Sequence, residues 1–104
     1  MIKANFLRSE GFYTAFSIEG HAGYADFGKD IVCAGVTSAV MTVLNGITEV
    51  AKINASVDVL ENEIVLNLAE RSKTSEVLLS SLRLQLEVLS EDYPDTINIT
   101  VTEV

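Results

Sequence analysis

IKANFLRSEGFYTAFSIE, residues 2–19, is the stretch that decides the fold. Apolar and polar residues alternate along 2–8 and again along 12–19, and Ser9-Glu10-Gly11 separates the two runs. Alternation with a period of two is typical of a strand with one buried face. A short glycine-containing break between two such runs is typical of a hairpin. The sequence therefore predicts that the chain begins with a β-hairpin.

Two helices and three further strands follow in the predicted order. Apolar residues recur at helical spacing after Asp30, whose carboxylate suits an N-cap, and Pro94 follows the second helical pattern. In chain order, the patterns predict strands at 2–8 and 12–19, a helix from 30 to about 51, strands at 57–60 and 64–68, a helix capped by Ser72 or Thr74 and ended by Asp92-Tyr93-Pro94-Asp95, and a strand at 97–101.

The order ββαββαβ indicates an α+β domain, with a mostly antiparallel sheet and two helices packed on one face. The other face of the sheet is expected to meet water or a second copy of the chain. A length of 104 residues suits one domain, 1–104, and the 48% hydrophobic residues suffice for a core.

The cysteine content and the apolar runs indicate the compartment. Cys33 is the only cysteine, so no disulfide forms within one chain, and an unpaired cysteine favours a reducing compartment. Charged and polar residues interrupt the first twelve residues, which therefore do not resemble a signal peptide. We also expect no apolar run long enough to span a membrane. The protein is expected to be cytoplasmic.

The formal net charge is −8. A phosphate backbone requires a basic face, so we expect no direct contact with nucleic acid. A basic protein or peptide partner fits this charge through electrostatic steering. Solubility alone also explains it, and both interpretations stay open.

Cys33 and His21, the only histidine, flank one glycine-rich stretch and are the candidate catalytic pair. His21 follows the second predicted strand. With Asp30 as N-cap, Cys33 would occupy the third helical position, where free N–H groups and the helix dipole favour a thiolate and could hold an oxyanion. A nearby imidazole would take the thiol proton.

The loop between them, residues 22–29, and Gly20 just before His21 supply the candidate lid or substrate-binding residues: Gly20, Gly23, Tyr24, Phe27 and Gly28. The glycines disfavour regular structure there. Tyr24 and Phe27 either contact a peptide or form a lid that folds onto the core.

Structural interpretations of the same residues stay open. A lone cysteine beside valines is commonly a small buried residue, and a lone histidine after a strand is commonly a surface residue. Asp30 is a helix cap or a group that orients the pair, and Asp26 is an uncertain third member of a triad. A single histidine and cysteine make a poor tetrahedral zinc site, so no metal is expected. The chain contains neither a CxxC pair nor a GxxxxGK[ST] loop.

Two segments carry a family resemblance: Gly20-His21-Ala22, and Asp30-Ile31-Val32-Cys33-Ala34-Gly35-Val36-Thr37. They resemble the signature of the ribosomal-processing cysteine protease family, and the length and element order are also similar. Thr37 stands where the family pattern often has serine, and the hydroxyl is kept.

The resemblance implies a cysteine endopeptidase with His21 and Cys33 as its dyad and no cofactor. It implies removal of the N-terminal extension of bacterial large-subunit ribosomal protein 27, with cleavage after a pair of aromatic residues. It also implies a homodimer and a flexible loop over residues 22–29. Two other functions stay open: a non-catalytic, ribosome-associated module that binds the same peptide, and a thiol redox sensor.

Overall fold

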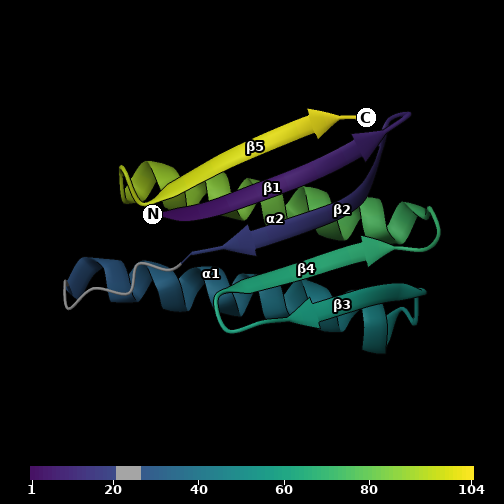
Figure 1. Cartoon of the computed structure of the whole chain (residues 1–104), viewed down its shortest axis with the longest axis horizontal. Helices are drawn as coiled ribbons and strands as arrows, with labels where there is room; N and C mark the ends of the chain where they lie inside the picture. Colours follow the sequence, from purple (N-terminus) through teal and green to yellow (C-terminus); the bar gives the residue numbers. More distant parts are fainter. Residues whose placement is uncertain (21–26) are drawn as a thin grey trace.

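The computed structural model describes residues 1–20 and 27–104. Its strands and helices follow the predicted order ββαββαβ (Figure 1), which confirms the α+β class. The elements are β1 (Ile2–Ser9), β2 (Phe12–Glu19), α1 (Phe27–Asn45), a π-helical turn η1 (Gly46–Val50), β3 (Ala55–Val59), β4 (Glu63–Leu68), α2 (Lys73–Asp92) and β5 (Ile97–Glu103).

The strands form one five-stranded sheet in the order β3-β4-β2-β1-β5. Three neighbouring pairs are antiparallel: β1 with β2, β2 with β4, and β3 with β4. Only β1 and β5 run parallel, because the chain crosses back along α2 before it enters the last strand. The predicted, mostly antiparallel sheet is therefore confirmed.

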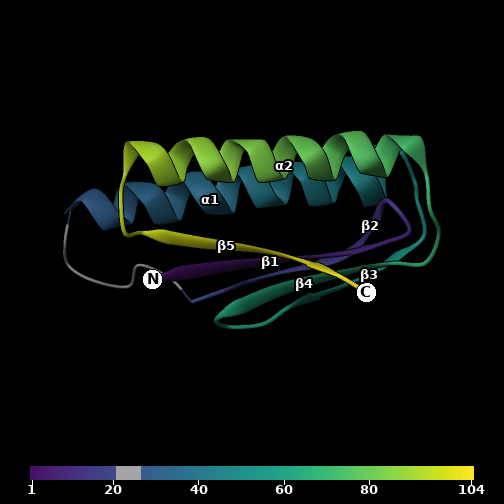
Figure 2. The same ribbon diagram turned by 90° about the horizontal axis from the view of Figure 1, so that it is seen from above.

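Both α-helices lie on the same side of the sheet (Figure 2), as predicted. The core between the layers contains Phe6, Phe16 and Leu66 from the sheet, which are at most 1% exposed. Facing them are the buried residues of the helices: Val32, Val36, Val40, Leu79, Leu82 and Leu86. Burial of such side chains contributes about 1.5–3 kcal/mol each, so this packing is the main force that fixes the helices on the sheet.

The strand β2 departs from simple alternation. Its register against β1 shifts between Leu7 and Arg8. Because of this bulge, Tyr13 and Phe16 are both buried, although an even alternation would place them on opposite faces. Phe16 lies tilted against Phe6, and Tyr13 meets Phe6 edge to face with the ring centroids 5.7 Å apart.

The helix α1 begins at Phe27, three residues before the predicted start. Asp30 therefore lies within the helix, and its prediction as the N-cap is wrong. The predicted loop 22–29 is likewise wrong at its end, because Phe27 and Gly28 belong to the helix. Cys33 consequently lies in the second turn, where backbone N–H groups bond within the helix. The prediction that free backbone N–H groups surround Cys33 is therefore wrong.

The segment Ile31–Val50 corrects a second expectation. By length and composition it is the one helix within the described residues that could cross a membrane, so the expectation of no such run was wrong. In the fold, its valines at 32, 36 and 40 are buried in the core. The core helix of a globular domain passes the same test of length and composition.

Candidate active site

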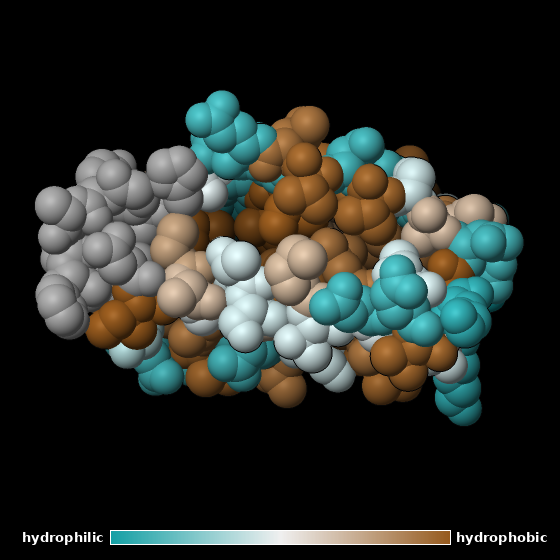
Figure 3. Space-filling view, turned by 90° about the horizontal axis from the view of Figure 1, so that it is seen from below, coloured by the Kyte–Doolittle hydropathy of each residue, from teal (hydrophilic) through white to brown (hydrophobic). Residues whose placement is uncertain are grey.

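A pocket of about 220 Å³ opens beside Cys33. It lies where α1, the end of β2 and the turn between β3 and β4 meet. Figure 3 shows this side of the molecule with apolar surface gathered around a hollow. The lining residues are Ile2, Ile18, Gly20, Cys33, Val36, Thr37, Val59, Leu60, Glu61, Asn62, Glu63 and Ile64.

Cys33 reaches the pocket from the second turn of α1. Its side chain is partly buried and packs against the hydrophobic core. Val36 and Thr37 lie about one helical turn further and line the same pocket, as i, i+3 and i, i+4 neighbours do. The core contact holds the thiol in place while the pocket gives it access to a ligand.

Gly20, at the end of β2, also lines the pocket. Its φ is +75°, which L side chains rarely adopt, and a Cβ there would lie 2.7 Å from the carbonyl oxygen of Met1. Its backbone N–H donates to the carbonyl oxygen of Asn62 at 3.0 Å. The end of β2 is thus held between the N-terminus and the β3–β4 turn. A glycine is required here for both conformation and space.

The structure brings together part of the predicted site. Gly20 and Cys33 line one pocket, and His21 follows Gly20 directly in the sequence. The positions of His21, Gly23, Tyr24 and Asp26 lie outside the described residues. Phe27, Gly28 and Asp30 belong to the first turn of α1.

The β3–β4 turn is the part of the site that the sequence did not reveal. Val59, Leu60 and Glu61–Ile64 line the pocket although they are distant from Cys33 in the sequence. They arrive there because β4 pairs with β2, with Glu63 opposite Glu19 beside Gly20. No local sequence pattern predicts the pairing of β4 with β2. Predicting the two strands β3 and β4 does not reveal which other strand of the sheet lies beside them.

The lining of the pocket determines what it can accept. Val59 and Leu60 provide exposed apolar surface, and Glu61 and Glu63 add carboxylates on the side of the turn. The pocket thus suits an apolar side chain held beside a thiol, with acidic groups nearby. Among residues 1–20 and 31–104, no three His, Cys, Asp or Glu side chains come close enough to hold a metal ion.

Comparisons with known proteins identify the family of the chain. The family model described as cysteine protease Prp matches residues 1–98 of the chain. The ribosomal processing cysteine protease Prp of Bacillus subtilis (strain 168) is 31% identical over 108 residues, which cover 96% of each chain. The chain is therefore of the cysteine protease class. It belongs to the cysteine protease Prp family.

Solved structures agree on the fold. The crystal structure of SMU.848 from Streptococcus mutans superposes with a TM-score of 0.89 at 25% identity, over 100% of this chain and 96% of that one. The ribosomal processing protease Prp from S. aureus, in complex with a covalently linked product peptide, superposes with a TM-score of 0.82 at 21% identity. That match covers 98% of this chain and 100% of the S. aureus protein. At this identity the second likeness supports the fold alone.

Proposed function

We propose that this chain is a site-specific cysteine endopeptidase that removes the N-terminal extension of bacterial large-subunit ribosomal protein 27 during ribosome maturation. One observation carries the proposal: Cys33 lines an apolar pocket that is also lined by Gly20, the residue before His21. A cleft that presents a thiol beside an apolar subsite suits attack on a peptide bond. The names of the relatives support a substrate from the ribosome.

In the proposed reaction, His21 and Cys33 act as a dyad. The imidazole takes the thiol proton, and the Cys33 sulfur attacks the carbonyl carbon of the scissile bond. The imidazolium then protonates the leaving amine as the C–N bond breaks, which leaves a thioester on Cys33. Water, deprotonated by the imidazole, hydrolyses that thioester and releases the acid product and the free thiol. Every proton is balanced within the pair and water, so the reaction requires no cofactor.

The pocket supports cleavage next to an apolar residue. An aromatic side chain placed against Val59 and Leu60, which are 63% and 58% exposed, would remove apolar surface from water, and such burial stabilises the complex. This lining fits one of the two aromatic residues that the family resemblance implies before the cleaved bond. The carboxylates of Glu61 and Glu63 suit a basic partner, in line with the net charge of −8.

We also propose that the enzyme acts in the cytoplasm as a homodimer. Val77, Leu84 and Val88 on α2 are 59%, 63% and 41% exposed and recur at helical spacing. They lie away from the buried side of α2, so a second copy could cover them. Light scattering should give twice the chain mass for the native protein and the chain mass for a Leu84→Lys variant. A native monomer would contradict the dimer.

The test of the proposed function is incubation with the extended ribosomal protein, followed by intact mass. The native enzyme should release the extension at one bond, and a Cys33→Ala variant should release none while it still binds the peptide. If the native enzyme binds the extension but leaves its mass unchanged, the chain is a peptide-binding module. If Cys33→Ala cuts as the native enzyme does, the nucleophile is another group.

A further inference from the structure

The strand β3 is one of the two edges of the sheet. It pairs with β4 alone, and the opposite side of Ala55–Val59 faces away from the sheet (Figure 1). A free strand edge offers a row of backbone donors and acceptors to any extended chain that reaches it. The other edge, β5, provides an internal comparison, because none of its residues lines the Cys33 pocket.

The hydrogen bonds at the two ends of β3 reveal which backbone groups are free. The amide of Ala69 donates to the carbonyl oxygen of Asn54 at 2.9 Å. The amide of Leu60 donates to the carbonyl oxygen of Glu63 at 2.8 Å. In an antiparallel ladder, bonded and non-bonded residues alternate. Ser56 and Asp58 therefore bond to β4, whereas the N–H and C=O groups of residues 55, 57 and 59 point to the free edge.

The free edge leads directly into the pocket that contains Cys33. Val59, the last residue of β3, lines this pocket together with Leu60. Both side chains are large, apolar and exposed, with exposed fractions of 63% and 58%. Figure 3 shows the apolar surface extending beyond the hollow on this side of the molecule. A peptide paired with β3 would thus pass over an apolar lip and arrive at the thiol.

From this geometry we infer that the peptide substrate binds as an added strand on the free edge of β3. This inference rests on the function proposed above and extends it to the mode of recognition. The backbone groups of residues 55, 57 and 59 hydrogen-bond the peptide, which contributes affinity without reading its sequence. The pocket then accepts the side chain next to the scissile bond. At about 3.3 Å per residue, β3 pairs with roughly five residues of the peptide.

The two faces of the added strand meet different surfaces. Side chains that point the same way as Val57 and Val59 face α1, which carries no charged residue from Ile31 to its end at Asn45. Side chains that point the other way lie beside Ser56 and Asp58 on the outer face of the sheet. The edge therefore selects an extended peptide with apolar residues at alternate positions, and with polar or basic residues between them.

A proline at position 59 tests the edge directly. Val59→Pro removes an outward N–H and obstructs an added strand, whereas the bonds of Ser56 and Asp58 to β4 remain. Val59→Ala is the matched control, because it shortens the same side chain and keeps the N–H. With a peptide that spans the extension and the first residues after the cleaved bond, kcat/KM should be at least about tenfold lower for Val59→Pro than for Val59→Ala.

Amide hydrogen exchange gives a second readout that does not depend on the proline variant. In the Cys33→Ala protein, the amides of Val57 and Val59 should exchange rapidly, and the same peptide should slow them at least about tenfold. The amides of Ile99 and Val101 on the other edge should not change.

Three combinations of results distinguish the edge inference from the proposed function. If the native enzyme cuts the peptide but the proline and alanine variants are equal and the two β3 amides stay unprotected, the edge inference is wrong and the proposed function stands. If the native enzyme does not cut but the β3 amides become protected, the proposed function is wrong and the edge binds peptides. If there is neither cleavage nor protection, both are wrong.

Discussion

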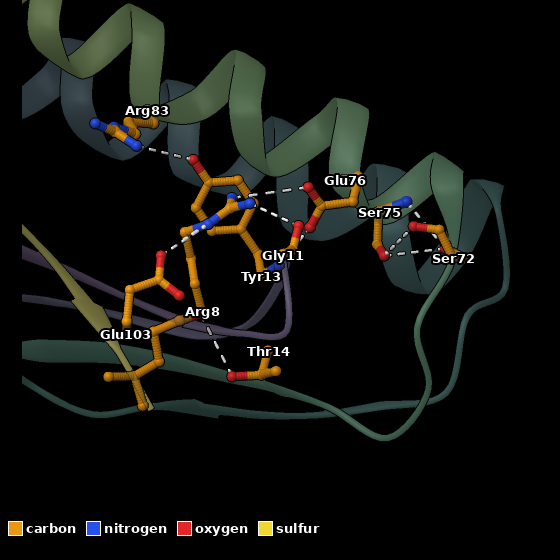
Figure 4. Close-up of polar contacts among 10 residues, drawn as sticks. Arg8, Gly11, Tyr13, Thr14, Ser72, Ser75, Glu76, Arg83 and Glu103 are labelled. Carbon is orange, nitrogen blue, oxygen red and sulfur yellow. Dashed lines mark hydrogen bonds and ion pairs between the residues drawn. The ribbon is translucent and has the colours of Figure 1, made fainter.

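The two ends of this molecule are built differently. At one end, Cys33 lies beside an open apolar pocket, and the nearby residues Val59 and Leu60 leave most of their side chains exposed. At the other end, where β1 turns into β2, charged and aromatic side chains hold three elements together (Figure 4). One end leaves groups available for a ligand, and the other satisfies its groups internally.

The polar end is centred on Arg8 and Tyr13. The Arg8 guanidinium lies 4.2 Å from the centroid of the Tyr13 ring and pairs with Glu76 on α2 and Glu103 on β5. The Tyr13 amide donates to the Glu76 carboxylate. The Tyr13 hydroxyl accepts from Arg83 at 3.3 Å, and this hydrogen bond raises the pKa of Arg83 above its ordinary value.

This difference indicates a division of roles. Ion pairs at the surface contribute little each, about 0–1 kcal/mol, but these partly exposed pairs join the first hairpin to α2 and β5. The hairpin is thereby fixed at its turn, and β2 extends from that turn to Gly20 at the pocket. Changes at the polar end should therefore affect stability alone, and changes at the pocket end should affect cleavage.

The largest expected effect is that of Cys33→Ala. Removal of the nucleophile should lower kcat by at least about 1000-fold. Because only one sulfur is lost from a partly buried site, the free energy of unfolding should change by about 1 kcal/mol or less. Cleavage kinetics and urea denaturation measure the two effects. A variant that loses stability and activity in parallel would show that Cys33 is mainly a packing residue.

His21→Ala should have the second-largest effect. It should lower kcat by about 100-fold to 10,000-fold, as expected for the loss of a general base. Added imidazole should restore part of the rate in this variant and none in Cys33→Ala. This rescue separates proton transfer from a structural role. Unchanged kcat in His21→Ala would remove the histidine from the mechanism.

The stability losses of Gly20→Ala and Gly11→Ala compare the backbone at the pocket end with the backbone at the polar end. Gly11 has a similar φ, +84°, but a Cβ there meets nothing within 4 Å. Gly11→Ala should therefore cost only the left-handed strain, about 1–2 kcal/mol. Gly20→Ala adds the clash with Met1 and should cost more, at least about 2 kcal/mol.

Cleavage should fall in Gly20→Ala and stay native-like in Gly11→Ala at a temperature where both are folded. Equal losses of activity in the two variants would argue against a special role for the end of β2.

The smallest expected effect is that of Tyr13→Phe. It removes the hydroxyl that accepts from Arg83 and keeps the ring beneath Arg8. The free energy of unfolding should fall by about 1 kcal/mol, the usual value for one hydrogen bond. Since the change is remote from the pocket, kcat/KM should stay within about twofold of the native value. A larger loss of activity would show that the two ends are coupled.

The sequence predicted most of the fold because its signals are local. Alternation in 2–8 and 12–19 predicted the first hairpin. Ser72, one of the two predicted caps of α2, is its N-cap and accepts from the Ser75 amide at 3.0 Å. The bulge that buries Tyr13 was missed, because it arises from pairing between strands. The start of α1 was placed at Asp30 because aspartate is a strong cap signal, and Phe27 carries none.

The candidate site was predicted in part for the same reason. Cys33 stands out in the sequence as the single thiol near a glycine-rich stretch. The turn at Glu61–Ile64 carries no chemical signature, and it joins the pocket only through the pairing of β4 with β2. A role that depends on the register between distant strands is not encoded in any local pattern.

The most direct test is labelling with a peptide chloromethyl ketone that carries the extension sequence up to the cleaved bond. The Cys33 sulfur should displace chloride and form one thioether, located at Cys33 by mass spectrometry of the digested protein. The rate should be at least about 100-fold faster than in the unfolded chain, and it should fall to the unfolded rate in His21→Ala. Labelling of the native protein no faster than of the unfolded chain would contradict an activated thiol in this pocket.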